Sequence, residues 1–279
     1  MKEILYSDIV KGVKEICMEA NFNLGSDVID AFRKGIEAEE SPVGRDVLKQ
    51  LIENAEIAAD DKIAMCQDTG FAVFFVEMGD TVRIAGGAIT DAINEGVRLG
   101  YDEGCLRKSI CHPFTRKNTG DNTPAVIHYE PVPGDRLKIT IAPKGGGSEN
   151  MSGIAMLNPS DGVEGVVQYV VGKVIESGAN PCPPVIVGVG IGGTFEKAAL
   201  LSKKALLRTV GSVNPDQEAY ALEKVILDRI NRSGVGPQGL GGRVTALAVH
   251  VIIHPCHMAS LPVAVNINCH AYRHKEIEF

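Results

Sequence analysis

The spacing of apolar residues changes near residue 60, and this change constrains the fold more than any other feature of the sequence. Before it, apolar residues recur every three or four positions in three stretches separated by Gly25-Ser26 and Ser41-Pro42, which predicts three amphipathic helices. After it, short β-rich runs alternate with helical segments. The expected β-runs are Ala72–Val76, Ala125–Tyr129, Leu137–Ala142, Val185–Val189, Val244–Ile253 and Leu261–Ile267, and the expected helices between them are Ile89–Leu99, Val163–Ile175, Phe195–Leu207 and Asp216–Ile230.

This pattern predicts an α/β fold of the mixed α+β kind, with a helical N-terminal region followed by a mixed β-sheet body flanked by helices. We expect a helical subdomain over residues 1–60 and a mixed α/β body over residues 61–279. One continuous domain over residues 1–279 is the alternative, because the chain has no repeat, low-complexity tract or disordered linker to mark a boundary.

Composition and charge exclude several classes of partner. Hydrophobic residues make up 44% of the chain, yet apolar stretches such as Val244–Ile253 are far shorter than the ~18 residues of a membrane span. The N-terminus lacks the apolar core and cleavage site of a signal peptide, so we expect a cytoplasmic protein with no membrane partner. A net charge of −7 without a dense Lys/Arg stripe argues against nucleic acid as a partner.

Seven cysteines in a chain without a secretion signal are not expected to form disulfides. Cys17 lies on the apolar face of the first helix, which is typical of a buried, hydrophobic thiol. Cys66 precedes a polar turn, and Cys182 lies between prolines that stiffen its loop, which suits a metal ligand or a buried thiol in a turn. Cys269 follows the run Leu261–Ile267 on the parity of its apolar residues, so core packing stays open for it.

The chain has no CxxC pair, which disfavours zinc ribbons and thioredoxin-like redox motifs. Any metal ligands are therefore spread along the chain, and only the fold can bring them together.

Two further kinds of residue are candidates for binding an anion. The run Lys144-Gly145-Gly146-Gly147-Ser148 offers consecutive backbone N–H groups beside a cation, which suits a carboxylate or phosphate, although a simple turn explains it equally well. Arg107 and Arg116 are candidates for pairing with a carboxylate, or are surface arginines.

The segment Gly188–Gly193 has the GxGxxG spacing of a dinucleotide-binding turn and follows an apolar run. No strand ending in an acidic residue follows about 20 residues later, as that fingerprint requires. We interpret the glycines as a tight strand-to-helix turn, with anion binding at the helix N-terminus left open. A non-catalytic nucleotide- or metal-binding protein that uses Gly188–Gly193 is the alternative of another class.

Taken together, these segments resemble the alpha subunit, or N-terminal half, of class I fumarases and L-tartrate dehydratases, the iron–sulfur hydro-lyases. The resemblance extends through nearly the whole chain and depends on the order of its motifs. These are Cys66-Gln67-Asp68-Thr69-Gly70, Leu106-Arg107, Asn118-Thr119-Gly120, Asn122 with Pro124-Ala125, Lys144–Ser148, Cys182-Pro183-Pro184, Gly190–Gly193, and His257 with Ala259-Ser260 leading to Cys269.

The resemblance implies a set of site residues. Cys66, Cys182 and Cys269 would hold a [4Fe-4S] cluster in which one iron has no cysteine ligand, whereas Cys105, Cys111 and Cys256 do not match ligand positions. The implied substrate-binding residues are Gln67, Asp68, Arg107, Lys144, Gly145, Gly146, Gly147 and His257, with Asp68 and His257 also expected to be catalytic.

The same resemblance implies an activity and a partner. We expect fumarate hydratase activity, forming (S)-malate reversibly, with L-tartrate dehydratase or another small-diacid hydratase as the alternative. The chain reads Cys269-His270-Ala271-Tyr272-Arg273 where single-chain fumarases have Ser-Ala-Asp-Arg after the cysteine, and it ends at Phe279. We therefore expect a beta subunit that carries the C-terminal catalytic domain and the general base, in a heterodimer or heterotetramer.

Overall fold

The computed structural model describes residues 2–279, so Met1 lies outside the described residues, and the chain forms two compact units. Unit 1 comprises residues 2–24, 54–146 and 273–279, and unit 2 comprises residues 25–53 and 147–272. The chain therefore crosses between the units after residues 24, 53, 146 and 272. None of these crossings lies at residue 60, where the change in apolar spacing predicted a boundary.

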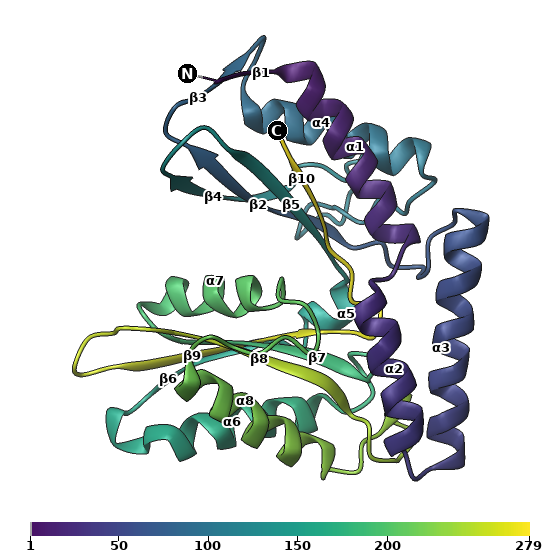
Figure 1. Ribbon diagram of the computed structural model, residues 1–279, viewed down its shortest axis with the longest axis vertical. Coiled ribbons are helices and arrows are strands. Elements are labelled where there is room, and N and C mark those ends of the chain that lie inside the picture. Colours follow the sequence, from purple (N-terminus) through teal and green to yellow (C-terminus); the bar gives the residue numbers. More distant parts are fainter. Residues whose placement is uncertain (1) are drawn as a thin grey trace. The chain divides into compact units, whose positions relative to one another are not determined.

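Unit 1 contains β1 (Lys2–Leu5), α1 (Tyr6–Phe22), β2 (Phe71–Gly79), β3 (Val82–Ala85), α4 (Ile89–Glu103), β4 (Val126–Val132), β5 (Leu137–Lys144) and β10 (Lys275–Glu278). Its main sheet has the order β10-β5-β2-β4, with β5 antiparallel to β10 and β2, and β2 parallel to β4. Helices α1 and α4 pack together against this sheet, and their buried faces form one core with its strands (Figure 1). Strands β1 and β3 form a separate parallel pair.

Unit 2 contains α2 (Ser26–Ala38), β6 (Gly153–Leu157), α6 (Gly162–Ser177), β7 (Val185–Gly192), α7 (Phe195–Ala205), α8 (Gln217–Asn231), β8 (Ala246–His254), β9 (Leu261–Asn268) and the 3₁₀ helices Pro159–Asp161 and Pro237–Gly239. Its sheet has the order β6-β9-β7-β8, with β7 parallel to β8 and antiparallel to β9. Figure 1 shows α7 on one face of this sheet and α6 and α8 on the other. Helices α3 (Pro42–Asp61) and α5 (Gly146–Glu149) each span a crossing between the units.

The mixed α/β fold class is confirmed, as are the three N-terminal helices and the ten later elements expected from periodicity. The sequence analysis missed β1, β3, β6 and β10. These strands are four or five residues long, lie at sheet edges or in the small pair, and have mostly half-buried or exposed residues. Such strands have no apolar run for a periodicity argument to detect. No helix of the described chain combines the length and apolar character that a bilayer crossing needs.

The glycines of β7 allow α7 to pack closely on the strand. A Cβ at Gly188 would lie 2.1 Å from the carbonyl oxygen of Ser202, and one at Gly190 would lie 2.2 Å from that of Ala198. Any larger residue would push the helix away from the strand. Gly188 and Gly190 therefore serve packing, as interpreted, but they lie inside β7, and only Gly192 and Gly193 lie at the turn into α7. The next strand of the sheet, β8, follows only after α8.

Candidate functional site

Two of the three predicted cluster ligands are neighbours in unit 2. Cys182 lies in the loop between α6 and β7, and Cys269 directly follows the last residue of β9. The backbone N–H of His270 donates to the carbonyl oxygen of Cys182 at 3.4 Å, and the His270 ring nitrogen Nδ1 lies 3.0 Å from the same oxygen. The Cys182 side chain is exposed and that of Cys269 is half-buried. The pairing of β7 with β9 therefore brings together the backbones of two cysteines that are far apart in the sequence.

The loop that presents Cys182 is held by a second residue, Gln238. Its backbone N–H and its side-chain Nε2 both donate to the carbonyl oxygen of Pro183, at 2.7 and 2.9 Å. Nε2 also lies 3.2 Å from Nδ1 of His270. Cys182 itself has a φ of 54°, in the left-handed region that non-glycine residues rarely adopt. The loop conformation is thus set by several hydrogen bonds, as expected for a residue that must present its side chain in one direction.

Cys66 lies in unit 1, in the turn that precedes β2. Its Sγ accepts the backbone N–H of Asp68 at 3.4 Å, and its own S–H points to the side-chain oxygen of Gln67 at the same distance. The Asp68 carboxylate accepts the backbone N–H of Gly70 at 2.9 Å and that of Gly146 at 2.8 Å. Asp68 therefore ties the Cys66 turn to the glycine segment that follows β5.

The glycine segment is more ordered than a flexible cradle. Residues Gly146–Glu149 form the short helix α5, and the Gly146 amide is already bonded to Asp68. Lys144 is 3% exposed and pairs with Phe71 in the β5–β2 register, so this cation is buried. In unit 2, a Cβ at the exposed Gly147 would lie 3.6 Å from the carbonyl oxygen of Asn180, which places Gly147 beside the Cys182 loop.

Arg107 is exposed beside the Cys66 turn in unit 1. The hydroxyl of Thr69 donates to the Arg107 carbonyl oxygen at 2.9 Å, which fixes the backbone from which the guanidinium projects. The buried side chain of Asn122 braces the same region, since it accepts the N–H of Ser109 and donates to the carbonyl oxygen of Gly70. Arg116 lies in an exposed loop, where its Nη1 donates a long hydrogen bond of 3.5 Å to the Pro113 carbonyl oxygen.

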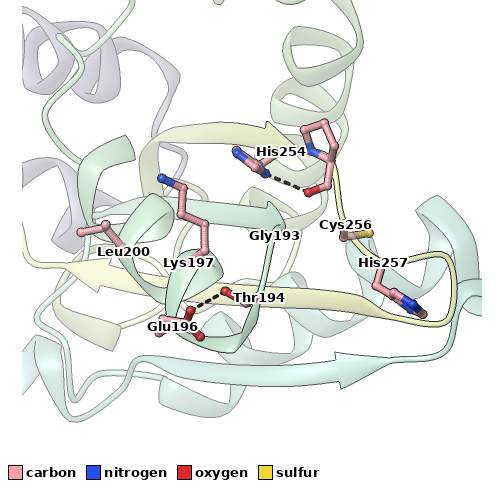
Figure 2. Close-up of a pocket in the computed structure, with 9 residues that line it drawn as sticks. Gly193, Thr194, Glu196, Lys197, Leu200, His254, Cys256 and His257 are labelled. Carbon is pink, nitrogen blue, oxygen red and sulfur yellow. Dashed lines mark hydrogen bonds between the residues drawn. The ribbon is translucent and has the colours of Figure 1, made fainter. Parts of the chain in front are cut away.

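His257 lines a pocket in unit 2 of about 390 Å³. The pocket lies where β7 and β8 end and α7 begins, and it is lined by Gly193, Thr194, Glu196, Lys197, Leu200, His254, Pro255, Cys256 and His257 (Figure 2). The N–H of Ala259 donates to Nδ1 of His257 at 3.1 Å, so the neutral ring carries its proton on Nε2. His257 can therefore donate a hydrogen bond from Nε2 to an oxygen of a ligand.

Sequence reasoning missed Lys197 and His254, which share this pocket with His257. Lys197 lies in the first turn of α7, after the glycine turn Gly192-Gly193, where both glycines have a positive φ. The signal was present in the sequence, because a lysine that close to a helix N-terminus adds a cation to any anion site there.

The remaining cysteines lie in different environments. Cys17 is fully buried in the unit 1 core, and burial raises the pKa of its thiol far above the ordinary range, so it stays protonated. Cys256 donates its S–H to the Ser260 carbonyl oxygen in the pocket loop, and Cys111 forms an isolated bridge with Asn118. Cys105 is exposed.

The chemistry of the three predicted ligands fits thiolate coordination of a metal. All three thiols are at least partly exposed and follow loops or strand ends, and an N–H···S bond such as that to Cys66 stabilises charge on sulfur. Among residues 2–279, no group of three His, Cys, Asp or Glu side chains is gathered closely enough to hold a metal ion. Cys182 and Cys269 belong to unit 2 and Cys66 belongs to unit 1.

Comparison with known proteins gives consistent matches along the chain. A family model described as "Fumarate hydratase (Fumerase)" matches residues 10–278. A protein of Methanocaldococcus jannaschii, provisionally named L(+)-tartrate dehydratase subunit alpha, is 42% identical over 267 residues, which is 94% of each chain. L(+)-tartrate dehydratase subunit alpha of Escherichia coli strain UTI89 is 36% identical over 251 residues, covering 88% of this chain and 82% of the relative.

Proposed function

Because the chain belongs to the fumarate hydratase (Fumerase) family, we propose that it is the alpha subunit of an iron–sulfur hydro-lyase that removes water from a small hydroxy diacid. The observation that carries this proposal is the pair Cys182 and Cys269, joined through His270 at one end of the unit 2 sheet in a chain of this family. The names of the relatives support the assignment as an alpha subunit. A beta subunit would complete the active site and supply the general base.

Cys66, Cys182 and Cys269 would hold the cluster. When bound, a [4Fe-4S] cluster with one iron free of cysteine supplies a Lewis acid for a hydroxyl and a carboxylate oxygen. The hydrogen bonds of His270 and Gln238 to the Cys182 loop orient this thiol before any metal arrives. Pre-oriented ligands lower the entropy cost of assembling the site.

The other site residues bind and orient the substrate. Arg107 is exposed and its guanidinium is suited to a substrate carboxylate. Asp68 has both carboxylate oxygens bonded to backbone amides, so it orders the turn that presents Gln67, and its remaining lone pairs can accept a substrate hydroxyl. His257 donates from Nε2 to a carboxylate or hydroxyl oxygen at the pocket in unit 2.

We place L(+)-tartrate ahead of fumarate as the substrate. The family description names fumarate hydratase, whereas the relatives that cover most of the chain are named for L(+)-tartrate. This order reverses the one expected from the sequence, where the motifs do not distinguish L(+)-tartrate from (S)-malate, two diacids that differ by one hydroxyl. Fumarate hydratase, with (S)-malate as product, is the second candidate.

The test is anaerobic co-expression of the chain with its candidate beta subunit, followed by measurement of iron, sulfide and turnover. We expect activity only when both subunits are present, with kcat/KM for L(+)-tartrate at least about tenfold above that for (S)-malate. A preference for (S)-malate and fumarate would move the assignment to the second candidate.

A fully iron-loaded complex that acts on none of these diacids would contradict the proposed activity. A chain that binds no iron under anaerobic reconstitution, but binds a dinucleotide through the Gly188–Gly193 turn, would favour the nucleotide-binding alternative. Crowding of that turn by α7 argues against such binding, since the positions where a Cβ would stand at Gly188 and Gly190 are filled by helix backbone.

A further inference from the structure

Arg273 is a buried cation without a matching anion. Its residue is 3% exposed, and it lies in unit 1 between the last crossing of the chain and β10. Its Nη2 donates to the carbonyl oxygen of Asp68 at 2.5 Å. Nε and Nη1 are buried and have no hydrogen-bond partner within residues 2–279. A guanidinium stays charged at all relevant pH values, so it cannot relieve this arrangement by losing a proton.

The neighbouring groups do not neutralise Arg273. The carboxylate of Asp68 is bonded to the amides of Gly70 and Gly146, and it forms no ion pair with the guanidinium within the described residues. The hydroxyl of the buried Tyr101 donates to the carbonyl oxygens of Thr69 and Gly70. Burial raises the pKa of Tyr101 far above the ordinary range, so its phenol remains neutral.

A buried charge without a partner is costly, and natural structures keep one only where something compensates for it. The residues near Arg273 indicate the chemical class of the group that compensates its charge. The turn that it holds carries Cys66, Gln67 and Asp68, and the exposed Arg107 is tied to the same turn through Thr69. The buried guanidinium of Arg273 at this turn is suited to a carboxylate, with which it can form two parallel hydrogen bonds.

We infer that Arg273 is the buried cation of an anion site built on the Cys66–Gly70 turn, and that a carboxylate of the bound ligand supplies the partner that Nε and Nη1 lack. The inference rests on the proposed function for the identity of the ligand as a diacid. It also gives Arg273 a positioning role, because the same guanidinium holds the main chain of Asp68.

Binding of malonate, a small dicarboxylate, to the cluster-free full-length chain tests the inference. Its dissociation constant is obtained from the rise in melting temperature with malonate, compared with chloride at equal ionic strength. We expect Arg273→Met to weaken malonate binding by at least about tenfold. Arg136→Met is the matched control in the same unit, because Arg136 is 48% exposed and pairs with Glu77 on the surface. This control should bind malonate as the wild type does.

The same melting curves distinguish a role of Arg273 in anion binding from a purely structural role. If Arg273 serves an anion, Arg273→Met in chloride should melt close to the wild type, because removal of an uncompensated buried charge offsets the loss of the hydrogen bond to the Asp68 carbonyl oxygen. A lower melting temperature in chloride together with unchanged malonate affinity would overturn the inference, as would a wild type that malonate does not stabilise. If Arg273→Met does not fold, Arg273→Lys keeps the charge without the planar fork, and an affinity equal to that of the wild type would count against the inference.

Turnover is not part of this measurement. A wild type that binds malonate through Arg273 but, with its beta subunit and iron, acts on no diacid would contradict the proposed function and leave the anion site intact. In the active complex, we expect Arg273→Lys to raise KM by more than it lowers kcat.

Discussion

Glu39 offers the sharpest test of how unit 2 is held together. This carboxylate is 0% exposed and lies between α2 and α3. Oε1 accepts the backbone N–H groups of Glu40 and Ser41 at 2.9 Å, and Oε2 accepts that of Val244 at 2.7 Å. The N–H of Arg243 lies 2.9 Å from both oxygens. One side chain therefore ties the N-terminal segment of unit 2 to the start of β8.

Replacement of Glu39 by Gln should be costly although the shape is almost unchanged. One acceptor oxygen becomes an NH₂ group that faces backbone donors, so at least one charge-assisted hydrogen bond is lost and one buried amide is left unsatisfied. A hydrogen bond to a charged group contributes about 1.5–3 kcal/mol, and an unsatisfied buried donor costs about 1–3 kcal/mol. We expect the free energy of unfolding to fall by about 3 kcal/mol near neutral pH.

The pH dependence gives the test a second readout. Burial by itself raises the pKa of the Glu39 carboxyl, but the backbone hydrogen bonds from Ser41, Val244, Arg243 and Glu40 outweigh it and hold the pKa below its ordinary value of 4.5. A pKa lowered in the folded state means that the stabilisation is fully present above pH 4.5 and is lost as the pH falls through the lowered value. The loss in free energy of unfolding caused by Glu39→Gln should therefore become smaller in acid.

Urea denaturation followed by circular dichroism measures the deficit, and hydrogen exchange at the amides of Arg243 and Val244 localises it. The control is Glu40→Gln, because the Glu40 side chain is 77% exposed and its ion pair with Arg243 lies at the surface. Such pairs contribute about 0–1 kcal/mol, so this variant should be close to wild type. Equal deficits in the two variants, or a deficit for Glu39→Gln that does not change with pH, would refute the reasoning.

Three further changes test the packing of unit 2 and the cluster ligands. Gly188→Ala should destabilise unit 2 by about 2 kcal/mol in thermal or urea unfolding, because its Cβ would lie 2.1 Å from an α7 carbonyl oxygen. The control is Gly172→Ala in α6, where the Cβ has open space and the change should be neutral or stabilising. Equal effects of the two changes on stability would contradict this reasoning. Asp216→Ala should cost about 1 kcal/mol in urea unfolding, since the Asp216 side chain accepts two backbone N–H groups at the start of α8, and Asp216→Asn should recover most of it. Cys182→Ala should lower the iron and sulfide bound after anaerobic reconstitution, whereas Cys105→Ala should not, and equal loss in both would mean that the ligand assignment is wrong.

Periodicity predicted every element that buries a long apolar face, since burial of one face leaves a repeat in the sequence. Periodicity does not distinguish the two interpretations of Cys269. The residues Pro262–Asn268 of β9 are all buried, because helices cover both faces of the sheet, so the parity of a residue in this strand says nothing about exposure. Cys269 lies just beyond the strand and is half-buried, a position that parity does not predict.

The parts of the site that the sequence did not reveal are long-range contacts between side chains and backbone. Nothing near Arg273 in the sequence indicates that its guanidinium meets the Asp68 carbonyl oxygen, and nothing near Glu39 indicates its bonds to residues 243 and 244. Such contacts depend on where two distant segments are brought by the fold, and they leave no local pattern. The resemblance, through the order of its motifs, supplied the candidate ligands, whereas the residues that support them belong to no motif.

Each unit consists of segments that are separated in the sequence, so its parts are synthesised at different times. Strands β2, β4 and β5 of unit 1 leave the ribosome before the long second segment of unit 2, whereas β10, which covers the outer edge of β5, follows that segment. Until then β5 presents an unpaired edge, the kind of edge that recruits other chains. Arg273 arrives with β10, so the Asp68 carbonyl oxygen gains its donor only at that stage. The nascent chain therefore completes the hydrogen bonds of the Cys66 turn only after all three predicted cluster ligands have been synthesised.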